Sequence, residues 1–268
     1  MNKLSKEEAI DLAHKGNTAA MVVLGGYYNK LAIEGEFNDD YFQEAKKWYS
    51  LAEEKGNLIG GYRYILCLAF EANVLKQVDF VGSKENWELL LQKTLQLIYK
   101  LNQNKLDIQS IDINSLYKTK RDCIYYLSII YYFEKDTNKA YNLISENDDK
   151  RSKILNILCQ IELNSTSNPE KYNRNVLLFE ENMKFLISFF EQSDSYRRSK
   201  KTYHENLIYN LAVIAVCKYY SSLEQHEKAV KLLKLVLDSD QNNQSNDMLI
   251  EELSHYKKKL FGGYKYIQ

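Results

Sequence analysis

The tripeptide Lys-Gly-Asn occurs twice in this chain, at residues 15–17 and again at residues 55–57. Each copy stands between two stretches that carry apolar residues at helical spacing, and glycine in that place ends a helix. A match of the chain with itself at a spacing of about forty residues is typical of helical repeat proteins, whose repeats are pairs of helices. The chain is therefore expected to be built from such pairs.

Helix signals extend over the whole chain. Ser5 and Glu8 have the spacing of a capping box, which predicts a helix from Ser5 to a stop at Gly16. Further helices are expected at about 18–34, 41–55, 58–77, 83–101, 116–134, 137–145, 149–163, 168–191, 207–220, 227–233 and 245–260. The chain has a single proline, and because proline breaks helix interiors, this favours an almost entirely helical fold. The predicted fold class is all-α, an α-solenoid of antiparallel helix pairs with about twelve helices.

Small, aromatic and turn residues recur at fixed spacings between residues 16 and 57: Gly16, Asn17, Ala20, Leu24, Gly25, Tyr28, Phe42, Ala45, Trp48, Tyr49, Ala52, Gly56 and Asn57. With these residues, the region from Gly16 to Asn57 resembles one Sel-one-like repeat, a relative of the tetratricopeptide repeat. The next unit departs from the pattern, because Tyr64 and Ile65 stand where the repeat has Leu-Gly. The resemblance implies a tetratricopeptide/Sel-one-like superhelix, with Sel-one-like repeats over residues 1–105 and degenerate tetratricopeptide-like repeats, continuous with them, over residues 106–268.

Charge and composition give no indication of a nucleic-acid or membrane partner. Lys+Arg and Asp+Glu are equal at 36 each, so no basic excess indicates nucleic acid or an anionic membrane as a partner. The first residues lack the apolar core of a signal peptide, and no segment is expected to reach the apolar length of a membrane span. The four cysteines lie far apart in apolar stretches, which predicts buried free thiols in a reducing compartment. The expected location is the cytoplasm.

Three patterns suggest chemistry, and each has a simpler structural interpretation. The Gly-Gly-Tyr sequences near residues 25, 61 and 262 lack the lysine and the glycine spacing of a phosphate loop, so helix contact or helix termination is favoured. Glu252 and His255 have the Glu-x-x-His spacing of di-iron bundles, but the chain has one copy where such sites need two. Arg198 and His204 loosely resemble the Arg–His motif of HEPN ribonucleases, in which histidine could act as base and arginine could stabilise charge.

The sequence nominates no catalytic, cofactor-binding or metal-binding residue. The favoured function is a non-catalytic, cytoplasmic scaffold that binds a protein or peptide through its concave surface, with Val22, Asn29 and Tyr62 as the predicted contact residues. A bacterial immunity protein that neutralises a toxin is a specific version of this function, and it predicts an acidic or aromatic patch on the concave face. The alternatives are a HEPN-like RNA-cleaving enzyme that uses Arg198 and His204, and a peptide-sensing regulator.

Overall fold

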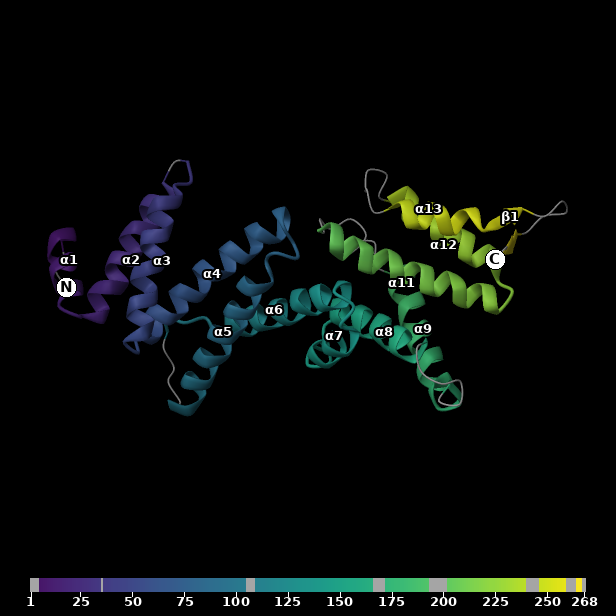
Figure 1. Cartoon of the computed structure of the whole chain (residues 1–268), viewed down its shortest axis with the longest axis horizontal. Coiled ribbons are helices and arrows are strands. Elements are labelled where there is room, and N and C mark those ends of the chain that lie inside the picture. The colour runs from purple at the N-terminus through teal and green to yellow at the C-terminus, as the bar shows by residue number, and fades with distance from the viewer. Residues whose placement is uncertain are drawn as a thin grey trace. The chain divides into compact units, whose positions relative to one another are not determined.

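The computed structural model describes residues 5–34, 36–104, 109–165, 172–192, 202–239, 246–258 and 264–266. Within these ranges the fold is all-α, apart from one short pair of strands (Figure 1). The chain divides into two compact units, Met1–Ile124 and Tyr125–Gln268, called unit 1 and unit 2 below. The division falls inside helix α6 (Ile113–Phe133), whereas the sequence suggested a change between residues 105 and 106, in the polar segment before that helix.

Among the described residues of unit 1, five helices lie wholly within the unit and pack consecutively, each against the next. They are α1 (Lys6–His14), α2 (Thr18–Ile33), α3 (Asp39–Glu54), α4 (Leu58–Val78) and α5 (Lys84–Asn104). The helices expected in this region are confirmed to within a few residues at each end. The capping box is also confirmed, because the Ser5 hydroxyl accepts from the backbone N–H of Glu8 and the Glu8 carboxylate accepts from that of Ser5.

The repeated Gly-Asn pair ends one helix and begins the next. Gly16 and Gly56 have φ angles of +90° and +84°, which L-residues with a side chain rarely adopt. At each turn, the N–H of the asparagine reaches back to close the preceding helix, Asn17 to the Leu12 carbonyl at 3.0 Å and Asn57 to the Ala52 carbonyl at 2.9 Å. The same asparagines cap the following helices. The Asn17 Oδ1 accepts from the Ala20 N–H at 3.0 Å, and the Asn57 Oδ1 accepts from the Gly60 N–H at 2.9 Å.

Small residues bring the helices of unit 1 close together. A Cβ placed on Gly25 would lie 2.5 Å from the Tyr49 ring, and one on Gly60 would lie 2.5 Å from the Ala52 Cβ. These glycines therefore serve helix contact, as the sequence predicted for the Gly-Gly-Tyr sequences that contain them. The core between the helices holds Ala9, Ala13, Ala20, Met21, Leu24, Trp48 and Ala52 in one cluster, and Ala32, Phe42, Ala45, Tyr49 and Cys67 in a second.

Unit 2 continues from the end of α6 with α7 (Thr137–Ile144), α8 (Lys150–Ser165), α9 (Tyr172–Gln192), α11 (Tyr203–Ser222), α12 (His226–Ser239) and α13 (Asp247–Ser254). α7 packs on α8, and α11 packs on α8, α9, α12 and α13. Tyr125, Tyr126, Tyr131 and Tyr132 of α6 are all buried, so these tyrosine pairs fill the core. The expected helix start at Asn168-Pro169-Glu170 lies outside the described residues.

Two turns of unit 2 repeat the geometry of the Gly-Asn turns without glycine. Lys135 and Glu224 have φ angles of 67° and 57°. The residues that follow them close the preceding helices by bonds of the same kind, Asp136 N–H to the Tyr131 carbonyl at 2.9 Å and Gln225 N–H to the Tyr220 carbonyl at 2.8 Å. Lys-Asp and Glu-Gln thus occupy the place that Gly-Asn holds in unit 1.

The expected final helix, 245–260, is wrong at its C-terminal end. The helix stops at Ser254, and β1 (Tyr256–Lys258) then pairs antiparallel with β2 (Tyr264–Tyr266). Tyr256 is buried, and its hydroxyl lies 2.7 Å from the Ser221 Oγ of α11. This contact holds β1 against α11. Together with the pairing of β1 and β2, it overrides the helix propensity of the segment after Ser254.

One described helix, α4, is long and apolar enough to cross a membrane by length and composition, contrary to the sequence expectation that no segment is. A single helix of this kind is weak support for a membrane span. α4 packs between α3 and α5, with Ile65, Leu68 and Ala72 buried, so we interpret it as a core helix. The four cysteines are buried free thiols, as predicted.

Candidate functional site: an acidic–aromatic surface in unit 1

The three predicted contact residues lie on α2 and α4 and are largely covered. Tyr62 is 7% exposed and belongs to the core. Val22 is half-buried and packs against both hydrophobic clusters of unit 1. Asn29 is also half-buried. These residues offer little area to a partner, and their role in binding stays a prediction.

The structure describes only part of the sequence patterns that suggested chemistry. Arg198 lies outside the described residues, while His204 lies half-buried with its ring 5.3 Å from that of Phe133, and burial lowers its pKa. Glu252 is buried, and burial raises its pKa. Within the described ranges, no group of three or more His, Cys, Asp and Glu side chains is placed to hold a metal ion.

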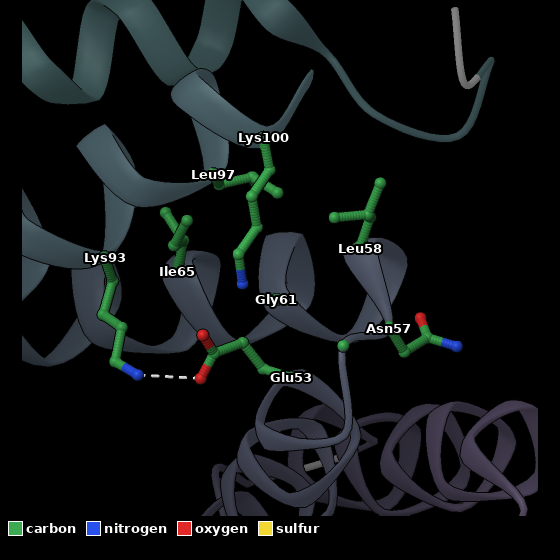
Figure 2. Close-up of a pocket in the computed structure, with 9 residues that line it drawn as sticks. Glu53, Asn57, Leu58, Gly61, Ile65, Lys93, Leu97 and Lys100 are labelled. Atoms are coloured by element: carbon green, nitrogen blue, oxygen red, sulfur yellow. Dashed lines mark hydrogen bonds and ion pairs between the residues drawn. The ribbon is translucent and has the colours of Figure 1, made fainter. Parts of the chain in front are cut away.

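A small enclosed pocket between α3, α4 and α5 is structural rather than ligand-binding. Figure 2 shows Lys93 of α5 reaching Glu53 of α3, with Leu58, Ile65 and Leu97 as apolar walls. The ion pair measures 2.7 Å and is largely shielded, with side-chain exposures of 24% and 14%. The cavity volume is about 10 Å³, which is room for one water molecule at most. The pocket therefore joins three helices and leaves no space for a substrate.

A cluster of aromatic rings that includes two exposed ones lies where α2 turns into α3. Phe37 in this turn, Phe42 of α3 and Phe70 of α4 form a triad with ring centroids 5.1 to 5.6 Å apart. Phe42 is buried beneath the other two, whereas Phe37 is 49% and Phe70 is 45% exposed. Because the buried ring supports the two exposed rings, their position is fixed by packing.

This apolar area extends along α4. Val74 and Val78 follow Phe70 at intervals of one helical turn, and Val78 is 83% exposed. Tyr41, in the first turn of α3, adds another exposed ring. Contiguous apolar surface of this kind usually marks an interaction site, because isolated exposed residues are common but rows of them are not.

Acidic residues flank these rings. Residues 33–45 include Glu34, Glu36, Asp39, Asp40 and Glu44 and contain no lysine or arginine. Lys30 and Lys46, on the neighbouring helical turns, are engaged by Glu34 at 3.2 Å and by Glu71 at 2.6 Å. In the described part of the chain, Glu36, Asp39 and Asp40 have no basic partner.

We call the group of Glu36, Phe37, Asp39, Asp40, Tyr41 and Phe70 the acidic–aromatic surface. Its backbone is held firmly, since the Asn38 N–H donates to the Ala32 carbonyl at 3.0 Å and the Asn38 side chain caps α3 at 3.1 Å. No site was predicted for residues 35–40, which lie between the helices expected at 18–34 and 41–55. The run of acidic residues without a lysine or arginine could have indicated the site from the sequence. The contact between Phe37 and Phe70 could not, because it depends on the packing of α4.

Comparison with models of protein families, with curated proteins and with solved structures finds no match to this chain.

Proposed function

We propose that this protein is a non-catalytic helical-repeat scaffold that binds a basic partner protein through its acidic–aromatic surface. The observation that carries the proposal is the combination of two exposed, packed phenylalanine rings with three acids that have no basic partner in the described structure. A few anchoring residues, often aromatic, supply most of the affinity at a protein interface, and charges around them steer the partner and fix its orientation.

The sign of the charge indicates the partner. An acidic rim repels anionic membranes and nucleic acids, and it attracts proteins whose contact surface carries lysine and arginine. A basic toxin neutralised by this chain is one specific form of the proposal. We place the protein in the cytoplasm, in line with its four buried free thiols.

The proposal includes a Sel-one-like repeat architecture, with the helices stacked as an α-solenoid. Two observations support it. Neighbouring helices pack consecutively in unit 1. In addition, the Asn57 side chain donates to the Thr18 Oγ1 at 3.1 Å, which connects the start of α4 to the start of α2.

Site-specific photo-crosslinking in the native host tests the interface. A photoreactive phenylalanine at position 37 should trap a partner, which is then identified and purified. Its affinity for the wild-type protein and for the double variant Glu36→Lys/Asp40→Lys is measured by calorimetry. We expect at least about a tenfold loss of affinity in the variant and a weakening of wild-type binding as salt is raised.

The matched control is Glu7→Lys/Glu85→Lys, which makes the same charge change. Both positions are exposed acids in the first turn of a helix, as Asp40 is, so the control loses at least as much favourable interaction with helix dipoles as the tested variant does. The control should bind as wild type does. Equal effects in the two double variants, or a partner whose affinity is independent of salt, would overturn the proposal.

A further inference from the structure

Unit 2 contains a large groove that is separate from the acidic–aromatic surface. It is formed by the end of α6, by α8 and α11, and by the start of α13, and its volume is about 730 Å³. This size falls in the range of about 300–1,000 Å³ in which proteins hold drug-sized ligands or the side chains of a docked segment. The pocket between α3, α4 and α5 is far smaller, so the groove is the stronger candidate for a binding site.

The floor of the groove is an apolar stripe on α11. Leu207, Leu211 and Ile214 follow one another at helical spacing and are half-buried. The opposite face of α11, including Val213, Val216 and Cys217, is fully buried. A helix that is apolar on all sides is normally covered on all sides. One face of α11 is therefore covered incompletely by the described residues.

The length of the stripe suits a helical ligand. From Leu207 to Ser222 the lining of the groove follows α11 for about 22 Å at 1.5 Å per residue. A partner helix of about 15 residues has the same length and can place apolar side chains at i, i+4, i+7 and i+11 against the stripe. Leu158 and Ile161 of α8 supply one apolar wall, and Met248 of α13 lies at the other side.

The polar groups of the groove select the charge of that helix. Lys135 follows α6, whose Phe133 contacts His204 at the start of α11, while Lys218 lies near the end of α11. Both lysines are exposed. The carboxylate in the wall, Glu162, accepts a hydrogen bond from the buried Tyr132 phenol. Burial, and then the neighbouring Glu162 carboxylate, raise the pKa of Tyr132. The groove thus offers a basic group towards each end of an apolar floor.

We propose that this groove binds an amphipathic helix of a partner protein, with an apolar face along α11 and acidic residues near its two ends that pair with Lys135 and Lys218. This site takes the opposite charge from the acidic–aromatic surface. The two sites lie in different units, so variants of one test that site alone.

The test uses the full-length protein and a displayed library of 15-residue helical peptides that are randomised at apolar and flanking positions. Selected peptides should share apolar residues at i, i+4, i+7 and i+11 and acids in both flanks. One selected peptide is then synthesised with a fluorescent label, and its dissociation constant is measured by anisotropy. The Lys135→Glu/Lys218→Glu variant should bind it at least about tenfold more weakly, and should prefer the same peptide with lysine flanks.

The control variant Lys150→Glu/Lys231→Glu changes charge on α8 and α12, at positions that do not line the groove, and should leave the dissociation constant unchanged. A methyl-labelled Met248 gives a readout in the unmutated protein, because its signal should shift when the peptide binds. No enrichment, enrichment of peptides with basic flanks, or an unshifted Met248 signal would each overturn the proposal.

Discussion

At the scale of single residues, four helix–helix turns share one backbone geometry but not one sequence. Gly16, Gly56, Lys135 and Glu224 all have positive φ. The left-handed conformation costs about 1–2 kcal/mol for a residue with a Cβ, and glycine avoids that cost while giving up more chain entropy on folding. Lys135 and Glu224 therefore carry strain that the two glycines do not.

We predict that Glu224→Gly raises the free energy of unfolding by about 0.5–1 kcal/mol, because relief of the strained φ exceeds the added entropy cost. Glu224 is exposed, so the change removes little packing. Urea denaturation followed by circular dichroism measures the effect. Glu224→Ala keeps the Cβ and serves as the control, which should show no such gain. A gain of the same size in both variants would refute the strain explanation.

The same turns show why this turn geometry could be predicted from the sequence in unit 1 and not in unit 2. Glycine followed by asparagine is a direct signal, since each residue has a conformational reason to be there. Lys135-Asp136 and Glu224-Gln225 have no such signature, although the chain reverses in the same way. A prediction from the sequence depends on the glycine and asparagine, whereas the backbone hydrogen bond that closes the preceding helix is present in all four turns.

At the scale of elements, most helices were predictable because their caps and apolar spacing are local. The final segment was not, because Tyr256-Lys257-Lys258 and Tyr264-Lys265-Tyr266 carry strand-like patterns that a charged helix can also accommodate. The candidate surfaces depend on contacts between elements. The acids near Phe37 were readable from the sequence, but the Phe37–Phe70 contact and the groove along α11 depend on how helices pack.

Two adjacent glycines of α2 should respond in opposite directions to the same substitution. Gly25→Ala should lower the free energy of unfolding by about 1–3 kcal/mol, because the new Cβ would lie 2.5 Å from the buried Tyr49 ring. Gly26→Ala should raise it by about 0.5–1 kcal/mol, because the nearest atom recorded is the Tyr49 hydroxyl at 3.8 Å and alanine favours helix. Thermal and urea unfolding of the two variants check this, and equal signs would contradict the packing of α2 on α3.

At the scale of the whole molecule, the cysteines report on the two units separately. Cys67 and Cys123 belong to unit 1, and Cys159 and Cys217 belong to unit 2. Burial raises the pKa of Cys67 and of Cys159 to about 12, so the reactive thiolate is scarce in the folded protein at pH 8. In an unfolded chain a thiol has a pKa of about 8.5 and reacts readily.

We expect all four native thiols to resist an aromatic disulfide reagent at pH 8. With rising urea they should become reactive in two pairs, Cys67 with Cys123 and Cys159 with Cys217, as each unit unfolds cooperatively. Pulse labelling followed by peptide mass spectrometry assigns each thiol. Rapid reaction of the thiols with the reagent in the absence of urea would contradict this expectation. So would a single transition in which Cys67 and Cys159 become reactive together.

The Gly-Asn turn has a consequence for how such a chain can lengthen. The segment from Gly16 to Lys55 begins at the residue that closes one helix, ends just before the next such residue, and includes the asparagine that caps its own first helix. A tandem duplication of its coding sequence would therefore insert a helix pair with both ends already satisfied. Each added copy would also bring a Thr18 equivalent for the next Asn57 equivalent to bind. The chain can therefore lengthen by duplication of this segment without acquiring new capping residues.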